Sequence, residues 1–198
     1  MRSFAILPAA GRSLRMGRPK LLLPWNGGLV IDQVLKTWLA SGVSHVVMVV
    51  RAEDEALIER VSRHPIELIL AEPPPADMKA SILLGLGRIA ERFAPRDDDV
   101  WLVAPADLPR LEARSIAAVL AARQPGSPGV LVASHGARRG HPVLLPWPLA
   151  REFAGSPADV SLKTLVERQS VRLVEVDDNG ATQDIDTRDD YDRLRPAT

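Results

Sequence analysis

The 198-residue chain has no cysteine and no apolar run that approaches the ~20 residues of a membrane-spanning helix. The absence of cysteine excludes disulfide bonds, thiolate metal ligands and a cysteine nucleophile, and it is compatible with a reducing cytoplasm. The chain also has no charge bias, because 25 lysines and arginines balance 25 aspartates and glutamates. We therefore expect a cytoplasmic protein that uses neither a membrane nor a nucleic acid as its partner.

The chain does contain an alternation of apolar strands and amphipathic helices. Continuous apolar or β-branched runs predict strands at residues 4–7, 45–50, 66–70, 100–103, 129–134 and 171–176. Apolar residues at helical spacing predict helices at residues 30–39, 53–63, 81–93, 112–123 and 189–194. This order predicts an α/β fold in a single domain, residues 1–198, with a Rossmann-like, mostly parallel sheet and helices on both faces.

In such sheets, ligands bind beyond the carboxyl ends of the strands, so the loops after the first, third and fourth strands are the first candidates. The loop after the first strand is rich in small and basic residues and reads LPAAGRSLRMGRPK at residues 7–20. Ala9, Ala10 and Gly11 allow close approach of the backbone, whose N–H groups can bind phosphate oxygens. Arg15 and Lys20 add positive charge that suits a triphosphate. The alternative is a solvated basic loop.

Two acidic segments are candidates for binding a metal ion. Asp107 follows the strand at residues 100–103 and lies between two prolines, where its carboxylate could bind a hard cation; the alternative is a turn or the start of a helix. Asp184 and Asp186 alternate on an extended segment and should point the same way, whereas Thr187 suits the N-cap of the last helix. From the residues alone we expect Asp107 to be a metal ligand, whereas Asp184 and Asp186 are not distinguished.

The string Leu-x-Ala-Ala-Gly-x-Ser-x-Arg-Met-Gly-x-x-Lys at residues 7–20 resembles the nucleotide-binding signature of the MobA-like NTP transferases. The molybdenum cofactor cytidylyltransferases are the branch that it resembles most. The resemblance implies one domain of the nucleotide-diphospho-sugar transferase type, which uses an NTP and Mg²⁺ and releases pyrophosphate. Ala10 stands where the guanylyltransferase branch has glycine, which implies CTP as the donor. In this family the Asp-x-Pro motif, here at Asp107, carries the magnesium ligand, and Asp186 matches the second one.

Later motifs of the family recur in order, with departures. Ser81 matches the serine of Gly-Met-x-x-Ser, although Asp77 replaces the glycine; Ser81 is expected either to contact the base or to cap its helix. His141 matches Gly-His-Pro on the acceptor side, with a structural role as its alternative. Where the family often has Gly-Asp-x-Gly-Ala-Arg, only Asp159 matches, which puts the acceptor contacts of that segment in doubt.

The resemblance and the residues together predict a nucleotidyltransferase. Arg15 and Lys20 would hold the triphosphate and stabilise the departing pyrophosphate, while Asp107 and Asp186 would hold Mg²⁺. The resemblance implies molybdopterin or molybdenum cofactor as the phosphorylated acceptor and a molybdoenzyme as a further partner. Two alternatives remain open: a nucleotidyltransferase for sugar phosphates or other small molecules, and a non-catalytic accessory protein that binds molybdenum cofactor.

Overall fold

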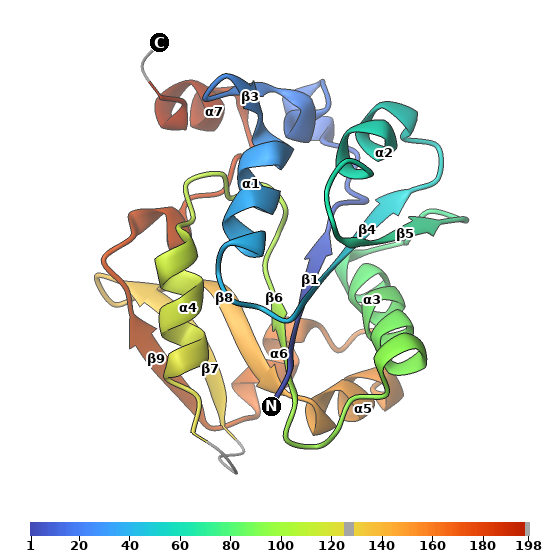
Figure 1. Ribbon diagram of the computed structural model, residues 1–198, viewed down its shortest axis with the longest axis vertical. Coiled ribbons are helices and arrows are strands. Elements are labelled where there is room, and N and C mark those ends of the chain that lie inside the picture. The colour runs from blue at the N-terminus through green and yellow to red at the C-terminus, as the bar shows by residue number, and fades with distance from the viewer. Residues whose placement is uncertain (125–128, 197–198) are drawn as a thin grey trace.

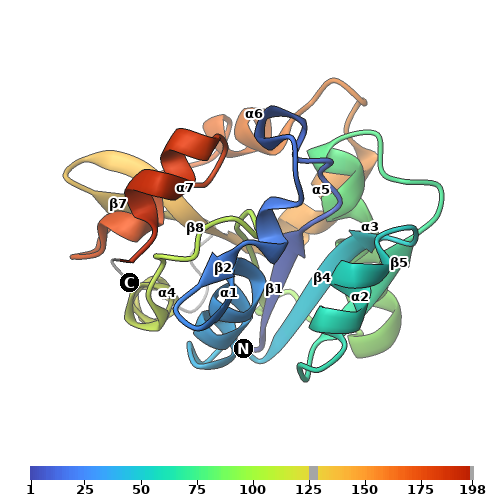
Figure 2. The same ribbon diagram turned by 90° about the horizontal axis from the view of Figure 1, so that it is seen from above.

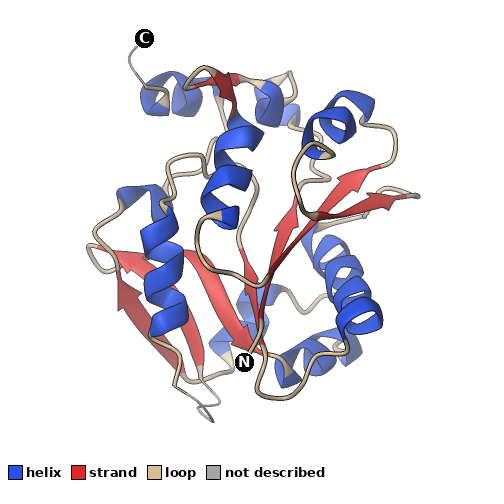
Figure 3. Ribbon diagram, viewed as in Figure 1, coloured by secondary structure: helices blue, strands red, loops and turns tan. Residues whose placement is uncertain are grey.

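The computed structural model describes residues 1–124 and 129–196, and its centre is a seven-stranded sheet (Figures 1 and 3). The strand order is β5-β4-β1-β6-β8-β7-β9. β8 runs antiparallel to both of its neighbours, and every other neighbouring pair is parallel. The strands are β1 (Ser3–Pro8), β4 (His45–Arg51), β5 (Glu67–Ala71), β6 (Val100–Val103), β7 (Val130–His135), β8 (Arg138–Pro146) and β9 (Val171–Glu175).

Helices cover both faces of this sheet, which confirms the predicted α/β class (Figure 2). The first face packs against α1 (Val30–Leu39), α2 (Glu55–Val61), α4 (Ala113–Ala121) and α7 (Arg188–Leu194). The second face packs against α3 (Met78–Phe93), α5 (Pro148–Gly155) and α6 (Leu162–Glu167). None of the described helices is long and apolar enough to cross a membrane.

Strand β4 shows why a continuous apolar run is stable in this fold. Val46, Met48 and Val50 pack into the core on the first face of the sheet. Val47 and Val49 alternate with them and pack into the core on the second face. Because side chains of a strand point alternately to opposite sides, a strand that is covered on both sides has no solvent-facing position.

The predicted boundaries are confirmed where the periodicity is strong, and they are wrong where a side chain sets the helix end. Helix α1 has the predicted bounds. Helix α3 starts three residues before the predicted start, because the Asp77 carboxylate accepts a hydrogen bond from the Ala80 amide at 2.8 Å and caps the helix there. Strand β8 was not among the predicted ranges, and neither were the short elements β2 (Pro24–Trp25), β3 (Gly28–Leu29), η1 (Leu14–Met16), η2 (Lys20–Leu22), η3 (Asn179–Thr182), α5 and α6.

A buried carboxylate, Asp99, fixes the start of β1 to the segment before β6. Its oxygens accept hydrogen bonds from the Arg2 amide at 2.6 Å, the Arg2 guanidinium at 2.7 Å and the Arg96 amide at 2.9 Å. Burial alone would raise the pKa of Asp99, but these hydrogen bonds outweigh burial and lower it. A carboxylate whose pKa is lowered by folding stabilises the protein above its ordinary pKa, and this contribution is lost as the pH falls through the lowered value.

We expect Asp99→Asn to lower the free energy of unfolding at neutral pH by about 2–3 kcal/mol, because the charge-assisted hydrogen bonds are lost. The difference from the wild type should shrink in acid, because the carboxylate is protonated first in the unfolded chain and then in the folded protein, which removes the wild-type advantage. Urea unfolding at about pH 7 and about pH 3 measures both quantities. A difference of equal size at the two pH values would contradict the assignment.

Candidate active site

A cavity of about 730 Å³ opens at the carboxyl ends of β1 and β6, which are neighbours in the sheet. Four segments that are distant in sequence line it. They are the loop after β1 (residues 8–21), the loop after β5 with the first turn of α3 (residues 74–81), the loop after β6 (residues 105–107) and the segment between η3 and α7, which contributes Asp184 and Asp186. The sheet therefore brings together the three loops that sequence analysis selected, and the chain adds a fourth segment to them.

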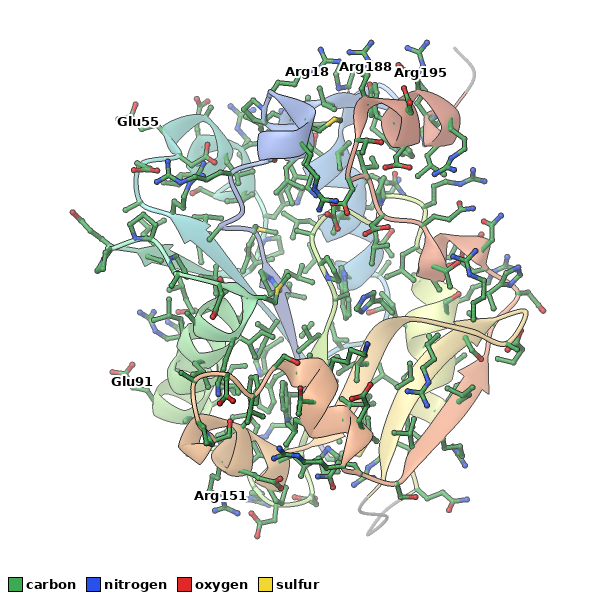
Figure 4. The ribbon with its side chains drawn as sticks, turned by 180° about the vertical axis from the view of Figure 1, so that it is seen from behind. Arg18, Glu55, Glu91, Arg151, Arg188 and Arg195 are labelled. Carbon is green, nitrogen blue, oxygen red and sulfur yellow. The ribbon has the colours of Figure 1, made fainter. Side chains whose placement is uncertain are left out.

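Eight of the nine predicted site residues line this one cavity: Ala9, Ala10, Gly11, Arg15, Lys20, Ser81, Asp107 and Asp186. The ninth, His141, does not. Within the loop after β1, Arg12 also lines the cavity, whereas Arg18 does not and is drawn at the outer edge of the molecule in Figure 4.

The centre of the cavity is an ammonium group between two carboxylates. Lys20 Nζ donates hydrogen bonds to Asp107 Oδ2 and, at 3.2 Å, to Asp186 Oδ1. Arg15 Nη2 lies 3.0 Å from Asp186 Oδ2. Burial lowers the pKa of Lys20, but the two carboxylates outweigh burial and raise the pKa above its ordinary value. Lys20 is therefore a cation at neutral pH, and it joins the loop after β1 to both acidic segments.

Asp107 has the properties of a ligand for a hard cation. Its side chain is nearly buried, and Oδ1 is shielded from solvent with no hydrogen-bond partner among the described residues. Burial raises the pKa of Asp107, Lys20 opposes this effect, and the Asp184 carboxylate adds to it. A buried oxygen without a partner calls for an explanation, and a bound ion supplies one. The carboxylates of Asp107 and Asp186 fit a divalent cation such as Mg²⁺ or Mn²⁺.

No group of three or more His, Asp or Glu side chains within the described residues is arranged to hold a metal by itself. A cation held by two carboxylates would complete its coordination with phosphate oxygens and water, which is how Mg²⁺ is commonly bound beside a nucleotide. The residues present therefore fit a metal that is shared between protein and substrate.

The backbone of the loop after β1 is only partly available to a ligand. The Ala9 amide donates to the Val49 carbonyl at 2.8 Å and so extends the pairing of β1 with β4. The amides of Ala10 and Gly11 donate to no described residue. The loop then turns tightly, with the Met16 and Gly17 amides donating to the Ser13 carbonyl. Gly17 has a φ of 66°, a left-handed conformation that glycine adopts without steric cost.

The first turn of α3 forms the opposite wall of the cavity. Its N-cap is Asp77, so the interpretation of Ser81 as the cap was wrong. The Ser81 hydroxyl donates to the Asp77 carbonyl at 3.2 Å, within the helix, and its lone pairs remain free to accept. Ser81 is buried and lines the cavity, so a contact with a ligand stays a prediction.

Close packing places the acidic segment after η3. An added Cβ at Gly140 would lie 2.3 Å from the Ala181 carbonyl oxygen, so β8 and η3 can approach each other only because this residue is glycine. Next, the Ile185 amide donates to the Asp107 carbonyl at 3.0 Å, and the Ile185 side chain is fully buried. The two flanking aspartates, Asp184 and Asp186, then both line the cavity, as their alternation in sequence indicated.

His141 lies outside the lining of the cavity, near Asp184. Burial lowers the pKa of its imidazole, and this effect is opposed by a hydrogen bond with the Val103 carbonyl and by the Asp184 charge. Nδ1 is shielded from solvent and has no hydrogen-bond partner among the described residues.

Asp159, the other residue matched on the acceptor side, also lies outside the lining of the cavity. Two charged residues that line the cavity, Arg12 and Asp184, were not among the predicted site residues.

Comparison with known proteins agrees with this geometry. Residues 5–173 match the model of the MobA-like NTP transferase domain. The chain is 28% identical over 204 residues to nicotine blue oxidoreductase of Paenarthrobacter nicotinovorans, a match that covers 96% of this chain and 94% of the relative. It is 25% identical over 187 residues to molybdenum cofactor cytidylyltransferase of Escherichia coli K12, covering 94% and 92%.

Among solved structures, Rv0371c of Mycobacterium tuberculosis H37Rv superimposes on the whole chain with a TM-score of 0.84 at 24% identity, and the match covers 100% of both chains. A complex of the same protein with manganese superimposes with a TM-score of 0.80 at 22% identity, again over 100% of both chains. At these identities the likeness establishes the fold.

Proposed function

The chain belongs to the MobA-like NTP transferase family, and on that premise we propose that it transfers a nucleoside monophosphate from an NTP, with CTP as the expected donor, to a phosphorylated small molecule. The observation that carries the proposal is the cavity in which Lys20 joins Asp107 to Asp186 beside the loop after β1. Cationic side chains, free backbone amides and two carboxylates in one cavity are what a metal-bound triphosphate requires. We further propose that residues 1–198 act as one nucleotidyltransferase domain.

The proposed reaction is an in-line displacement at the α-phosphorus of the NTP. An oxygen of the acceptor phosphate forms the new bond to phosphorus, the bond from phosphorus to the bridging oxygen of the β-phosphate breaks, and pyrophosphate leaves with the electron pair. The acceptor oxygen is already anionic, so no general base is required. Catalysis then depends on positioning and on stabilising charge.

Each cavity residue has a definite role in this proposal. Lys20 and Arg15 bind oxygens of the triphosphate and stabilise the charge that develops on pyrophosphate. The amides of Ala10 and Gly11 donate hydrogen bonds to phosphate oxygens. Asp107 and Asp186 hold a divalent cation, which neutralises charge on the phosphates when it is bound. The manganese complex of Rv0371c supports a divalent cation for this fold.

The choice of CTP and of molybdenum cofactor rests on relatives and on Ala10. The Escherichia coli relative is a molybdenum cofactor cytidylyltransferase, and Ala10 matches the cytidylyltransferase form of the signature. We propose molybdopterin or its molybdenum form as the acceptor, His141 as a residue on the acceptor side and a molybdoenzyme as the recipient of the product. Two alternatives remain: the acceptor is a sugar phosphate or another small molecule, or the protein binds molybdenum cofactor without catalysing a reaction.

The oxidoreductase name of the Paenarthrobacter relative does not change this proposal. The loop after β1 does not have the GxGxxG pattern of a dinucleotide-binding loop, so no sequence motif favours an oxidoreductase. The cavity instead combines cations with carboxylates, which suits a metal-bound polyphosphate.

We expect the purified protein to release pyrophosphate from CTP in the presence of Mg²⁺ and of molybdopterin or its molybdenum form. Pyrophosphate release should stop when EDTA removes the metal. The test measures pyrophosphate release with CTP, GTP, ATP and UTP, each with and without acceptor, and with sugar phosphates as further acceptors. Release with another combination of NTP and acceptor would support the nucleotidyltransferase activity but assign it different substrates. No release with any pair, despite binding of an NTP, would favour the accessory protein.

A further inference from the structure

A buried lysine, Lys79, lies in the first turn of α3 beside the cavity but does not line it. Its ammonium donates to the Ser156 carbonyl at 3.1 Å, the Ser156 hydroxyl at 2.8 Å and the Pro157 carbonyl at 2.6 Å. It also lies 5.0 Å from the centroid of the Phe153 ring. Among the described residues no carboxylate pairs with this ammonium. Lys79 therefore joins α3 to the turn that follows α5, on the same face of the sheet (Figure 1).

Two effects act on the charge of this lysine. The residue belongs to the first turn of α3, where the helix dipole disfavours a positive charge, but its ammonium lies at the C-terminal end of α5, where the dipole favours one. Burial of an ammonium group without a carboxylate is also costly, and the three oxygen acceptors only offset that cost. An apolar side chain would avoid the buried charge, but it would leave the Ser156 and Pro157 carbonyls without this donor. Departures of this kind from local preference are expected at functional sites.

Lys79 is connected to the cavity through its neighbours in the chain. Asp77 and Met78 precede it, Ser81 follows it, and all three line the cavity. The contacts of Lys79 with the turn after α5 therefore determine where this wall of the cavity stands relative to the loop after β1. The far end of α3 is held in a similar way, because the Arg2 guanidinium donates to the Phe93 carbonyl at 2.9 Å and to the Ala94 carbonyl at 3.2 Å. Only the end held by Lys79 meets the cavity.

We propose that Lys79 is a positioning residue for the nucleotide: through Ser156 and Pro157 it holds the first turn of α3 at the place where that turn contacts the bound NTP. This inference rests on the proposed function, since it takes the occupant of the cavity to be a nucleoside triphosphate. Lys79 touches neither the nucleotide nor the metal in this role. It acts through the residues on either side of it in the helix.

The test compares Lys79→Met with Arg2→Met, which loosens the opposite end of the same helix and also removes the guanidinium that pairs with Asp99. Isothermal titration with CTP and Mg²⁺, without an acceptor, gives the Kd and the binding stoichiometry of each purified variant. We expect Lys79→Met to raise the Kd roughly tenfold at unchanged stoichiometry, as is typical when a residue that supports a binding site is lost. Arg2→Met should lower the thermal stability and leave the Kd within about twofold of the wild type. Lys79→Arg, which keeps the charge and the donors, should give an intermediate Kd.

The outcomes separate this inference from the proposed function. If the wild type binds CTP and Lys79→Met binds it equally well, the inference is wrong and the proposed function stands. An equal rise of Kd in Arg2→Met would show that general loosening of α3 is responsible, and would also overturn the inference. No binding of CTP, GTP, ATP or UTP by the wild type would overturn both. If Lys79→Met does not fold, Lys79→Gln, a neutral donor, is titrated in its place and judged by the same criteria.

Discussion

Replacement of Asp107 with asparagine is expected to lower kcat/KM by about a thousandfold or more while the fold is retained. The cavity pairs this carboxylate with Lys20 through one oxygen and leaves the other oxygen buried and without a partner. In the proposed mechanism that carboxylate holds the divalent cation, and an uncharged amide binds Mg²⁺ far more weakly. Loss of the group that places positive charge at the reacting phosphate should affect the chemical step above all.

The fold should survive this substitution for a reason visible in the pKa of Asp107. Burial raises that pKa, which means that the folded protein favours the neutral form of this side chain more than water does. Asparagine is neutral and has nearly the same shape, and Lys20 keeps its hydrogen bond to Asp186. We expect a thermal unfolding midpoint within a few degrees of the wild type, roughly the shift produced by less than 1 kcal/mol.

The measurement is steady-state pyrophosphate release by Asp107→Asn over a range of Mg²⁺ concentrations, with circular dichroism to follow unfolding. Asp189→Asn is the matched control, because Asp189 is an exposed residue of α7 outside the lining of the cavity. It should keep the wild-type rate. Wild-type activity in Asp107→Asn would refute the metal role of this residue.

The sequence alone was sufficient to identify the residues whose position follows from strand order. Ala10 and Lys20 lie in a loop after one strand, and Asp107 lies in a loop after another; because β1 and β6 are neighbours in the sheet, these loops meet. The alternation of an extended segment placed Asp184 and Asp186 on the same side, and the resemblance to the family selected Asp186. The predictions for the two loops needed only a local pattern and the rule that ligands bind at the carboxyl ends of parallel strands.

The sequence was insufficient where a role depends on contacts between distant segments. Lys79 is separated by 77 residues from Ser156, and nothing in its local sequence indicates that its ammonium is buried there. Capping was one of two alternatives left open for Ser81, and Asp77 was not considered as the cap because it was compared with a family glycine; the structure shows that Asp77 is the N-cap. His141 was selected from a motif, and the structure places it outside the lining of the cavity, on strand β8, which pairs with β6.

Replacement of Lys20 with methionine is expected to change metal binding and turnover in opposite directions. The Lys20 ammonium bonds to the same carboxylates that are proposed to hold the cation, so it repels a metal and competes with it for Asp107 and Asp186. Without that charge, binding of Mn²⁺ or Mg²⁺ in the absence of nucleotide should become tighter. In contrast, kcat/KM should fall by about 10²–10³-fold, because the variant lacks a donor that stabilises charge on the departing pyrophosphate.

The same substitution should shift the dependence of the rate on pH. Lys20 is the group that lowers the pKa of Asp107 against the effect of burial, so its loss raises that pKa further. A higher pKa means that the carboxylate is protonated earlier as the pH falls, and the residual activity of Lys20→Met should therefore decline at a higher pH than that of the wild type.

Metal affinity measured by titration with Mn²⁺, together with kcat/KM from pyrophosphate release between about pH 5 and pH 9, tests both effects. Lys163→Met is the matched control, since the Lys163 side chain is 85% exposed on α6 and pairs only with Glu167 among the described residues. Weaker metal binding in Lys20→Met would show that Lys20 supports the metal site and does not compete for it. Tighter metal binding together with slower turnover would show that one side chain neutralises the carboxylates and, when the triphosphate is bound, acts on the phosphates.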